Sequence, residues 1–516
     1  MKILRCFPVF LILFLSVLNA FAQNKEVEVL ARTGSGILRG TTEENICVWR
    51  GIKYAEAERF GYPHAPPPWK GVQDALKFGA VAVQTKSMIS SKEPQSEDCL
   101  FLNIWSPCAD SLKRPVMVWI HGGSLVAGSG SQPIYNGLKL ARNGDVVVVT
   151  INYRLGPLGF LYFNTPVEGN DTLGNNLGIH DQIAALQWVK ENIAAFGGNP
   201  DRVTIFGESA GATSVQTLLA SPAAKGLFIA AIAQSGTPAM VWTPSLADSI
   251  TKKYFSFLRL NPTNKHLLKT LPLDSLKAAQ EKLLKYMLTT DNKVFAPTID
   301  GKVLTADIFS SIDQQVNARV PLLLGTNNDE STIFVKTMKT APKNAKQLNE
   351  YIDRICKNDK QQVLAGYEKY PRKAAVMEIL TDALFRVPNI RLSEQRLVYA
   401  PVYLYRFEWC SFFLKVTGLR SFHGIEMPFI FGSTDRKTGR LLKVVATKKV
   451  IKQLSGAMQK AWTNFARYGN PNGITSETWK PYTTTERATM IFDKKCSIAQ
   501  DPDKIQRQAW TGVKYY

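Results

Sequence analysis

A Gly-x-Ser-x-Gly pattern, formed by Gly207, Ser209 and Gly211, is the clearest sign of chemistry in this sequence. It follows an apolar, β-branched run, Arg202–Phe206, and precedes a helical pattern that continues to about Ala220. Such a Ser sits on a strained turn between a strand and a helix, which exposes its hydroxyl as a nucleophile. Glycines flank it because a Cβ at either position would collide with the neighbouring strand or helix. The pattern predicts a nucleophilic Ser209, and a tight turn with a buried Ser is the alternative.

A nucleophilic Ser needs a base, and the chain has only five histidines. In the order Ser, acid, His that accompanies this turn, only His266 and His423 follow Ser209. His266 lies in a polar, helix-like segment. His423 follows the strand-like run Val402–Glu408 in a loop, which is where open sheets carry their functional residues. His423 is therefore the predicted base. The remaining histidines are His64, His121 and His180.

The acid that orients the base must lie between Ser209 and His423, at the C-terminal end of a strand. The strand-like run Val320–Gly325 leads to two acidic neighbours, Asp329 and Glu330. Spacing alone does not choose between them. The alternative for each is a solvated start of a helix.

Backbone donors for a developing oxyanion are expected in two places. The apolar run Pro115–Ile120 ends in His121-Gly122-Gly123-Ser124, whose N–H groups can supply two donors, and the N–H of Ala210 can supply a third. Phosphate binding is the alternative for this Gly-rich turn. However, the turn lacks a Gly-Lys-Ser/Thr ending, and the chain lacks a Gly-x-Gly-x-x-Gly pattern, so nucleotide binding is not expected.

The elements that must position these residues alternate between strand and helix, which predicts an α/β fold with one parallel sheet covered by helices on both faces. Residues 244–290 are expected to form mostly short helices that cap the sheet. Without an internal repeat or linker, residues 23–516 are expected to form a single domain. The expected strands are Glu26–Leu30, Cys47–Tyr54, Pro115–Ile120, Asp145–Asn152, Arg202–Phe206, Val320–Gly325 and Val402–Glu408; the expected helices are Ile179–Phe196, the segment up to Ala220, and Ile451–Arg467.

Residues 1–22 are interpreted as a cleaved secretory signal, because Lys2 and Arg5 precede the apolar run Phe7–Leu18 and small residues follow it. A membrane anchor is the alternative, but this run is too short to cross a bilayer comfortably and no later run is long enough. The mature protein is therefore expected to be secreted or periplasmic, without an integral membrane segment.

Composition narrows the function classes. Apolar residues make up 45% and charged residues 20% of the chain, which is ordinary for a globular protein. The net charge of +21 would suit nucleic acid, anionic glycans or a membrane surface, but the basic residues are scattered, and no nucleic acid partner is expected. No Cys-x-x-Cys pair occurs, so no metal site is expected. The cysteines left after the signal are Cys47, Cys99, Cys108, Cys356, Cys410 and Cys496.

Motifs from nearly the whole mature chain resemble the type-B carboxylesterase and cholinesterase family of α/β-hydrolases. The resemblance implies an α/β-hydrolase fold, no cofactor, and a small-molecule ester substrate hydrolysed through an acyl-enzyme. The motifs are Arg50-Gly51-Ile52-Lys53-Tyr54-Ala55, Ser96-Glu97-Asp98-Cys99-Leu100, Trp119-Ile120-His121-Gly122-Gly123, Phe206-Gly207-Glu208-Ser209-Ala210-Gly211, Gln234-Ser235-Gly236, Asp329-Glu330-Ser331, His423-Gly424-Ile425-Glu426 and the stretch 464–472.

Carried over residue by residue, the resemblance makes Ser209 the nucleophile, His423 the general base and Glu330 the acid. It also implies an oxyanion hole formed by Gly123, Ser124 and Ala210, with Gly122 shaping the turn. Ser124 stands where the family usually has Gly or Ala, and its backbone donor should survive that change. Trp242 matches a family aromatic near the acyl pocket, for which an ordinary core Trp is the alternative.

The sequence departs from the family in two places. Ala82 replaces the family's partner for Cys99, so Cys99 is expected to be a free thiol and the chain resembles a bacterial-type esterase; pairing of Cys99 with Cys108 is the alternative. The loop Gln84–Gln95 has no Trp, so choline esters are not expected as substrates. Some relatives are adhesion proteins that have lost the nucleophile, but this chain keeps the triad. An exported serine carboxylic-ester hydrolase is therefore predicted, with a non-catalytic binding protein as the alternative.

Overall fold

The computed structural model describes residues 28–513 except 86–90, 109–111, 165–172, 291–294, 315–318, 338–341, 343, 357–358 and 435–447. The predicted signal, residues 1–22, lies outside the described residues, as does part of the loop Gln84–Gln95.

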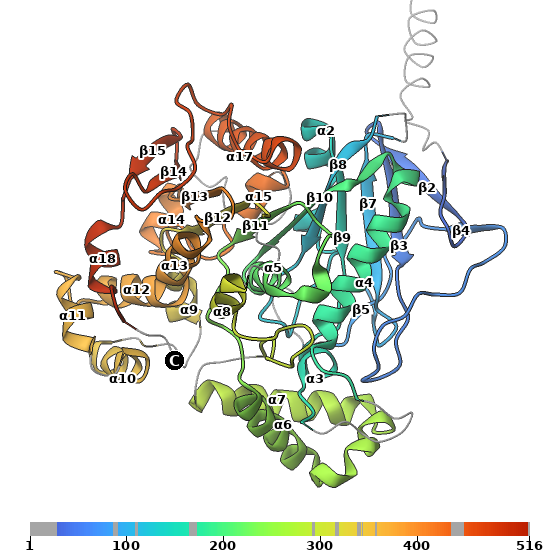
Figure 1. Cartoon of the computed structure of the whole chain (residues 1–516), viewed down its shortest axis with the longest axis horizontal. Helices are drawn as coiled ribbons and strands as arrows, with labels where there is room; N and C mark the ends of the chain where they lie inside the picture. The colour runs from blue at the N-terminus through green and yellow to red at the C-terminus, as the bar shows by residue number, and fades with distance from the viewer. Residues whose placement is uncertain are drawn as a thin grey trace, which may run out of the picture.

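One large twisted sheet organises the described part of the chain and contains 13 strands there (Figure 1). Its central strands run parallel, as predicted, and antiparallel strands extend it at both edges. The parallel strands, in spatial order, are β9 (Val147–Ile151), β8 (Arg114–Ile120), β10 (Gly198–Glu208), β11 (Ala230–Gln234), β12 (Leu322–Asn327), β13 (Val402–Phe407) and β14 (Ala488–Phe492). The edges are β1 (Val29–Arg32), β2 (Ile37–Glu43), β3 (Ile46–Lys53) and β7 (Phe101–Ser106) on one side and β15 (Ser497–Gln500) on the other; β4 (Val72–Asp74) pairs with β2, and β5 (Val81–Ala82) pairs with β6 (Gln95–Ser96).

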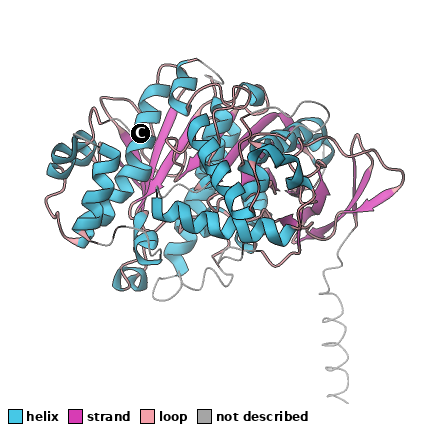
Figure 2. Cartoon of the chain, turned by 90° about the horizontal axis from the view of Figure 1, so that it is seen from below, coloured by secondary structure: helices cyan, strands magenta, loops and turns pink. Residues whose placement is uncertain are grey.

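Both faces of the sheet are buried, and β8 shows why. Side chains alternate between the faces of a strand, so Val116, Val118 and Ile120 join one core cluster while Met117 and Trp119 join another. Every residue of β8 is buried, which explains why all of them except Arg114 are apolar. Figure 2 shows the helical layers against the sheet. Helices α4 (Leu177–Asn192) and α5 (Ala210–Ala220) contribute to the first cluster, and α2 (Leu138–Gly144) and α17 (Lys448–Tyr468) to the second.

The segment predicted to cap the sheet is helical, but its two main helices are longer than expected. Helices α6 (Pro244–Leu258) and α7 (Leu273–Thr290) pack on each other, with η4 (Pro262–Lys269) between them. They lie together at the bottom of Figure 1, beside α3 (Gly156–Phe160). Proline and Asn mark the starts of these helices rather than interrupting them: Pro244 and Pro262 occupy first turns, where Pro is tolerated, and Asn261 caps η4.

The chain from residue 308 onwards adds further helices around β12 to β15. Several of them pack into a third core cluster, away from the two faces of the sheet. They are α8 (Ile308–Asp313), α9 (Ser331–Thr337), α10 (Ala345–Cys356), α11 (Lys360–Ala365), α12 (Lys373–Thr381), the π-helical turn η6 (Asp382–Arg386), α13 (Val387–Arg396), α14 (Phe412–Val416), α15 (Met427–Ile430) and α18 (Lys504–Ala509); short 3-10 turns are η1 (Pro133–Tyr135), η2 (Ile193–Phe196) and η3 (Pro222–Ala224).

The cysteines partly follow the prediction. Cys99 is a buried free thiol, as expected, and it lines a small cavity together with Ala82. Cys108 is bonded to Cys47, so the alternative Cys99–Cys108 pair does not form.

In the described ranges, no helix is long and apolar enough to span a bilayer, and no cluster of His, Cys, Asp and Glu has the arrangement of a metal site.

Candidate active site

Ser209 occupies a sharp turn between β10 and α5, as its sequence pattern predicts. Its backbone has φ +58° and ψ −125°, a conformation that few side chains adopt. The N–H of Ser209 is fixed by a 2.9 Å hydrogen bond to the carbonyl of Gln234 on β11, and its side chain is half-buried. A Cβ on Gly211 would lie 2.1 Å from the carbonyl oxygen of Ile120, and one on Gly207 would lie 2.6 Å from the carbonyl carbon of Gly211. Glycine is therefore required on both sides of Ser209.

The Gly-rich turn after β8 packs directly against Ser209. A Cβ on Gly122 would lie 2.6 Å from the carbonyl oxygen of Glu208 and 3.1 Å from the Cβ of Ser209. Gly123 and Ser124 adopt positive φ values of 115° and 56°. These conformations turn the chain so sharply that the carbonyl of Gly123 accepts hydrogen bonds from Val126 and Ala127. The turn that carries the predicted donors therefore lies against Ser209.

His121 holds this turn in place. Its ring is buried and stacks on Tyr153, with centroids 4.4 Å apart, and the Tyr153 hydroxyl donates to the carbonyl of His121. Burial lowers the pKa of His121 to about 4. The neutral ring can therefore donate from Nδ1 to the carbonyl of Gly122, 2.8 Å away. This bond fixes the peptide that leads to Gly123.

His423 is paired with Glu330. The distance between Nδ1 of His423 and Oε2 of Glu330 is 2.6 Å, and the Glu330 side chain is fully buried. Its other oxygen, Oε1, accepts from the N–H of Asn327 at the end of β12. The turn after β12 and the loop after β13 lie side by side because these strands are parallel neighbours. The sheet thus brings together two residues that are far apart in the sequence.

Asp329, the other candidate acid, belongs to a different group. Its carboxylate lies 3.6 Å from Nη1 of Arg420 and accepts from the side chain of Asn328. Its N–H donates to the carbonyl of Ser421. Asp329 therefore anchors the loop that carries His423, while Glu330 contacts the imidazole. This contact favours Glu330 of the two acids that spacing left open.

Two more carboxyl groups surround His423. Oε1 of Glu208 lies 3.2 Å from Nε2 of His423, and Glu426 accepts from the side chain of Asn327 at 2.6 Å. Burial raises the pKa of Glu208 and of Glu426 above the ordinary range of a carboxyl group, and in both the charge of Glu330 adds to this. Burial by itself lowers the pKa of His423, but the charges of Glu208 and Glu330 outweigh it and raise that pKa to about 9.

This arrangement suits acyl transfer, and comparison with known proteins agrees. The pattern that defines the carboxylesterase family matches residues 25–510. The chain is 38% identical to the para-nitrobenzyl esterase of Bacillus subtilis (strain 168) over 93% of its own length and 98% of that protein. It belongs to the carboxylesterase family. It is also 31% identical to the phenmedipham hydrolase of Pseudarthrobacter oxydans, over 92% of this chain and 98% of that one.

Solved structures show the same fold. A PNB esterase structure that is 37% identical covers 94% of this chain and 100% of its own, with a TM-score of 0.83. The carboxylesterase therefore has the α/β-hydrolase fold that the sequence resemblance implied, and it is a carboxylic ester hydrolase. The alternative of a non-catalytic adhesion protein receives no support from these relatives.

Sequence reasoning missed several residues of the carboxylesterase site. Phe334 and Phe385 each lie 5.0 Å from the His423 ring, centroid to centroid, and form an aromatic wall against it. Phe385 comes from the π-helical turn η6, a rare geometry that often marks functional sites. Glu208 and Glu426 lie inside motifs that the resemblance had identified, but nothing in their spacing shows that both carboxyl groups act on the pKa of His423.

The two remaining candidates from the sequence lie elsewhere in the carboxylesterase. His266 is exposed on η4. Trp242 is fully buried, and its ring lies 5.9 Å from that of Phe295 in the core. An ordinary core position accounts for these contacts, and a role for Trp242 in the acyl pocket stays a prediction.

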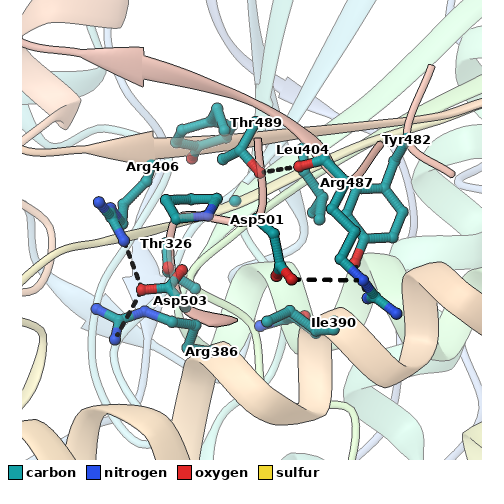
Figure 3. A pocket seen from close by; sticks show the side chains of 14 residues that line it. Thr326, Arg386, Ile390, Leu404, Arg406, Tyr482, Arg487, Thr489, Asp501 and Asp503 are labelled. Atoms are coloured by element: carbon teal, nitrogen blue, oxygen red, sulfur yellow. Dashed lines mark hydrogen bonds and ion pairs between the residues drawn. The ribbon is translucent and has the colours of Figure 1, made fainter. Parts of the chain in front are cut away.

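A separate hollow of about 30 Å³ lies beside η6, β12 and β13, and neither Ser209 nor His423 lines it. Figure 3 shows that arginine and aspartate side chains converge on it. Arg386 and Arg406 share the carboxylate of Asp503, and Arg386 also donates to the carbonyl of Asn328. These contacts connect the C-terminal segment to the turn that presents Glu330. The residues around the hollow therefore stabilise the position of that turn.

Proposed function

We propose that this carboxylesterase is an exported serine esterase whose triad is Ser209, His423 and Glu330. The observation that carries the proposal is the 2.6 Å contact between Nδ1 of His423 and Glu330, close to the strained turn that presents Ser209. That contact leaves Nε2 as the nitrogen that can exchange a proton. Within the described residues Nε2 has no hydrogen-bond partner, and it lies on the side of Glu208, which adjoins Ser209 in the chain.

In the proposed reaction, Nε2 of His423 takes the hydroxyl proton of Ser209 while Oγ attacks the acyl carbon of the ester. Glu330 accepts from Nδ1–H and stabilises the imidazolium that forms. The imidazolium then gives its proton to the leaving alkoxide as the ester C–O bond breaks, which yields the alcohol and an acyl-enzyme. Water, deprotonated by the same nitrogen, attacks the acyl-enzyme, and the carboxylic acid leaves as Ser209 regains its proton.

The proposed oxyanion hole consists of the backbone N–H groups of Gly123, Ser124 and Ala210. The close approach of Gly122 to the Cβ of Ser209 supports it, because the turn then lies beside the residue that carries the proposed nucleophile. Ala210 is the first residue of α5, so its N–H points out of the helix and has no partner within that helix. The positive end of the α5 dipole adds to the stabilisation of the anion.

Export is proposed from residues 1–22, read as a secretory signal. The Cys47–Cys108 disulfide supports this proposal, because disulfides persist mainly in oxidising compartments. We place the mature protein in the periplasm or outside the cell. Neutral carboxylic esters are the proposed substrates. Para-nitrobenzyl esters, which give the relative in Bacillus subtilis its name, are the first probes to use.

Two sets of variants test the triad with an aryl acetate at equal folded concentration. Ser209→Ala removes only the nucleophile, and we expect a loss of about 10⁴-fold or more in kcat/KM with an unchanged circular dichroism spectrum. Glu330→Gln should lose far more activity than Asp329→Asn, because only Glu330 contacts His423. Turnover by Ser209→Ala comparable to that of the wild type, or a more damaging Asp329→Asn, would refute the assignment. A panel of esters that varies the acyl and alcohol size then defines the pocket.

A further inference from the structure

A loop that contains α14 connects β13 to the segment just before His423. This loop leaves the sheet at Trp409 and returns at Ser421. The hydroxyl of Ser421 donates to the carbonyls of Glu408 and Trp409, so the two ends of this loop are joined by hydrogen bonds. The carbonyl of Ser421 accepts from Asp329, which adjoins Glu330. The loop that contains α14 is therefore anchored to the segments that present the candidate catalytic residues.

Helix α14 exposes several apolar side chains to solvent, although the loop that contains it is fixed at both ends. Leu414 is fully buried in the core, and the side chain of Ser411 caps the helix by accepting from the N–H of Leu414. In contrast, Phe412 is 64% exposed and Val416 is 69% exposed, and Phe413 beside them is also exposed. Residues four apart lie on the same face of a helix. Large apolar side chains grouped in this way mark an interaction surface more often than isolated ones do.

Cationic side chains border this apolar face. Lys415 is exposed on α14 itself, and the Arg420 side chain is 58% exposed. The ammonium group of Lys336, on α9, donates to the carbonyl of Thr417 at the end of α14. Of the nearby carboxylates, that of Asp329 is mostly covered and lies beside Arg420, and Asp493 is half-buried. The surface therefore combines projecting apolar groups with a positively charged border.

We propose that this surface, formed by Phe412, Phe413, Val416, Lys415, Arg420 and Lys336, docks the protein on an anionic lipid surface. The apolar side chains enter the boundary between headgroups and acyl chains, and the cations pair with lipid phosphates. Charge favours lipid over a second copy of this chain: two copies, each with a net charge of +21, would bring their cationic borders together. Docking by so few side chains is reversible and weakens with salt. It does not depend on which residue is the nucleophile.

Vesicle sedimentation with the purified protein tests this proposal. We expect binding to vesicles of phosphatidylglycerol and phosphatidylcholine, and much weaker binding to pure phosphatidylcholine. The double variant Phe412→Ser/Val416→Ser should lose about tenfold in partition coefficient. Lys415→Glu should weaken binding to the anionic vesicles alone. Val398→Ser is the matched control, because Val398 is 79% exposed but precedes β13, at the opposite end of that strand from α14.

Turnover of a soluble aryl ester at wild-type rate shows that each variant is folded. If the double variant is not folded, Lys415→Glu and the salt dependence of wild-type binding still decide the question. The proposal is overturned if the folded double variant binds as well as the wild type, or if binding is equal on both kinds of vesicle. It is also overturned if no vesicle is bound while light scattering shows a dimer that the double variant abolishes, since the surface then pairs two copies.

Discussion

The carboxylate of Glu208, the residue directly before Ser209, lies 3.2 Å from Nε2 of His423. Nε2 is the nitrogen proposed to take the proton of Ser209, so the charge of Glu208 acts directly on the proposed general base. This anion stabilises the imidazolium and raises the pKa of His423, against the opposing effect of burial. Because catalysis needs the neutral ring, Glu208 shifts the acid limb of the activity towards higher pH.

Glu208→Gln should therefore move the acid limb of kcat/KM to lower pH by about one unit. The amide keeps the shape of the side chain but removes the charge, so the imidazolium is less stable and His423 loses its proton at lower pH. The measurement is the pH profile of kcat/KM with a neutral aryl ester. Asp329→Asn is the control, because that carboxylate pairs with Arg420, and its acid limb should not move. A limb that stays in place, or moves to higher pH, in Glu208→Gln contradicts the electrostatic role.

The core of the site could be predicted from local sequence because its parts are local. The turn around Ser209 needs glycines two residues away on each side, and the elimination of histidines left His423. The surrounding groups could not be predicted in this way. Asn327 reaches Glu426, and Phe385 reaches His423, only because β12, β13 and η6 converge in three dimensions.

The sheet was also predicted in part. The strands that carry the site have strongly apolar runs. All of them lie within two residues of their predicted bounds except β10, which begins at Gly198 rather than at Arg202. In contrast, β11 reads Ala-Ala-Ile-Ala-Gln, a short run whose residues favour a helix as readily as a strand. Its neighbours β10 and β12 make it a strand by pairing with it on both sides. Helices α10, α11 and α12 pack into the third core cluster rather than on the sheet, so the strand–helix alternation gave no sign of them.

The close packing at the elbow makes Gly211→Ala a sharp test of the turn. The new Cβ would lie 2.1 Å from the carbonyl oxygen of Ile120, a backbone atom that cannot move aside alone. We expect the free energy of unfolding to fall by about 1–3 kcal/mol and kcat to fall by about tenfold or more.

Gly456→Ala is the matched control for that variant. Gly456 is exposed within α17, and an added Cβ would meet nothing within 4 Å. This variant should gain about 0.5–1 kcal/mol in unfolding free energy, because Gly is unfavourable within a helix, and it should keep full activity. Denaturant titrations and aryl-ester assays of both proteins measure the contrast. Equal effects of the two variants would show that the elbow tolerates a side chain.

The thiol of Cys99 should be free but unreactive in the folded protein. It is buried, and burial raises its pKa well above that of an ordinary thiol, so little thiolate forms. Alkylation should therefore label Cys99 only after denaturation without reductant. Mass spectrometry of the same digest should find Cys47 and Cys108 in one disulfide-linked peptide, which serves as the internal reference. Recovery of Cys99 in a disulfide peptide would contradict the structure.

Neutral esters should be hydrolysed better than quaternary ammonium esters of the same size, for two separable reasons. First, the loop Gln84–Gln95 has no aromatic residue to face a cation, and the Gln84 side chain is already bonded to the backbone of Gly128. This contact effect should persist at any salt concentration. Second, the net charge of +21 repels cations at long range, and this effect should fade as the Debye length falls to about 8 Å at physiological ionic strength.

Values of kcat/KM for butyrylcholine and for an uncharged butyrate ester, measured at low and high salt, distinguish the two effects. The neutral ester should be favoured at both, by a larger factor at low salt. A preference that disappears at high salt would leave only the long-range repulsion and would mean that the loop does not discriminate. A cationic ester hydrolysed as well as the neutral one at both salt concentrations would contradict both arguments, because the site would then hold a cation by contacts that this loop does not supply.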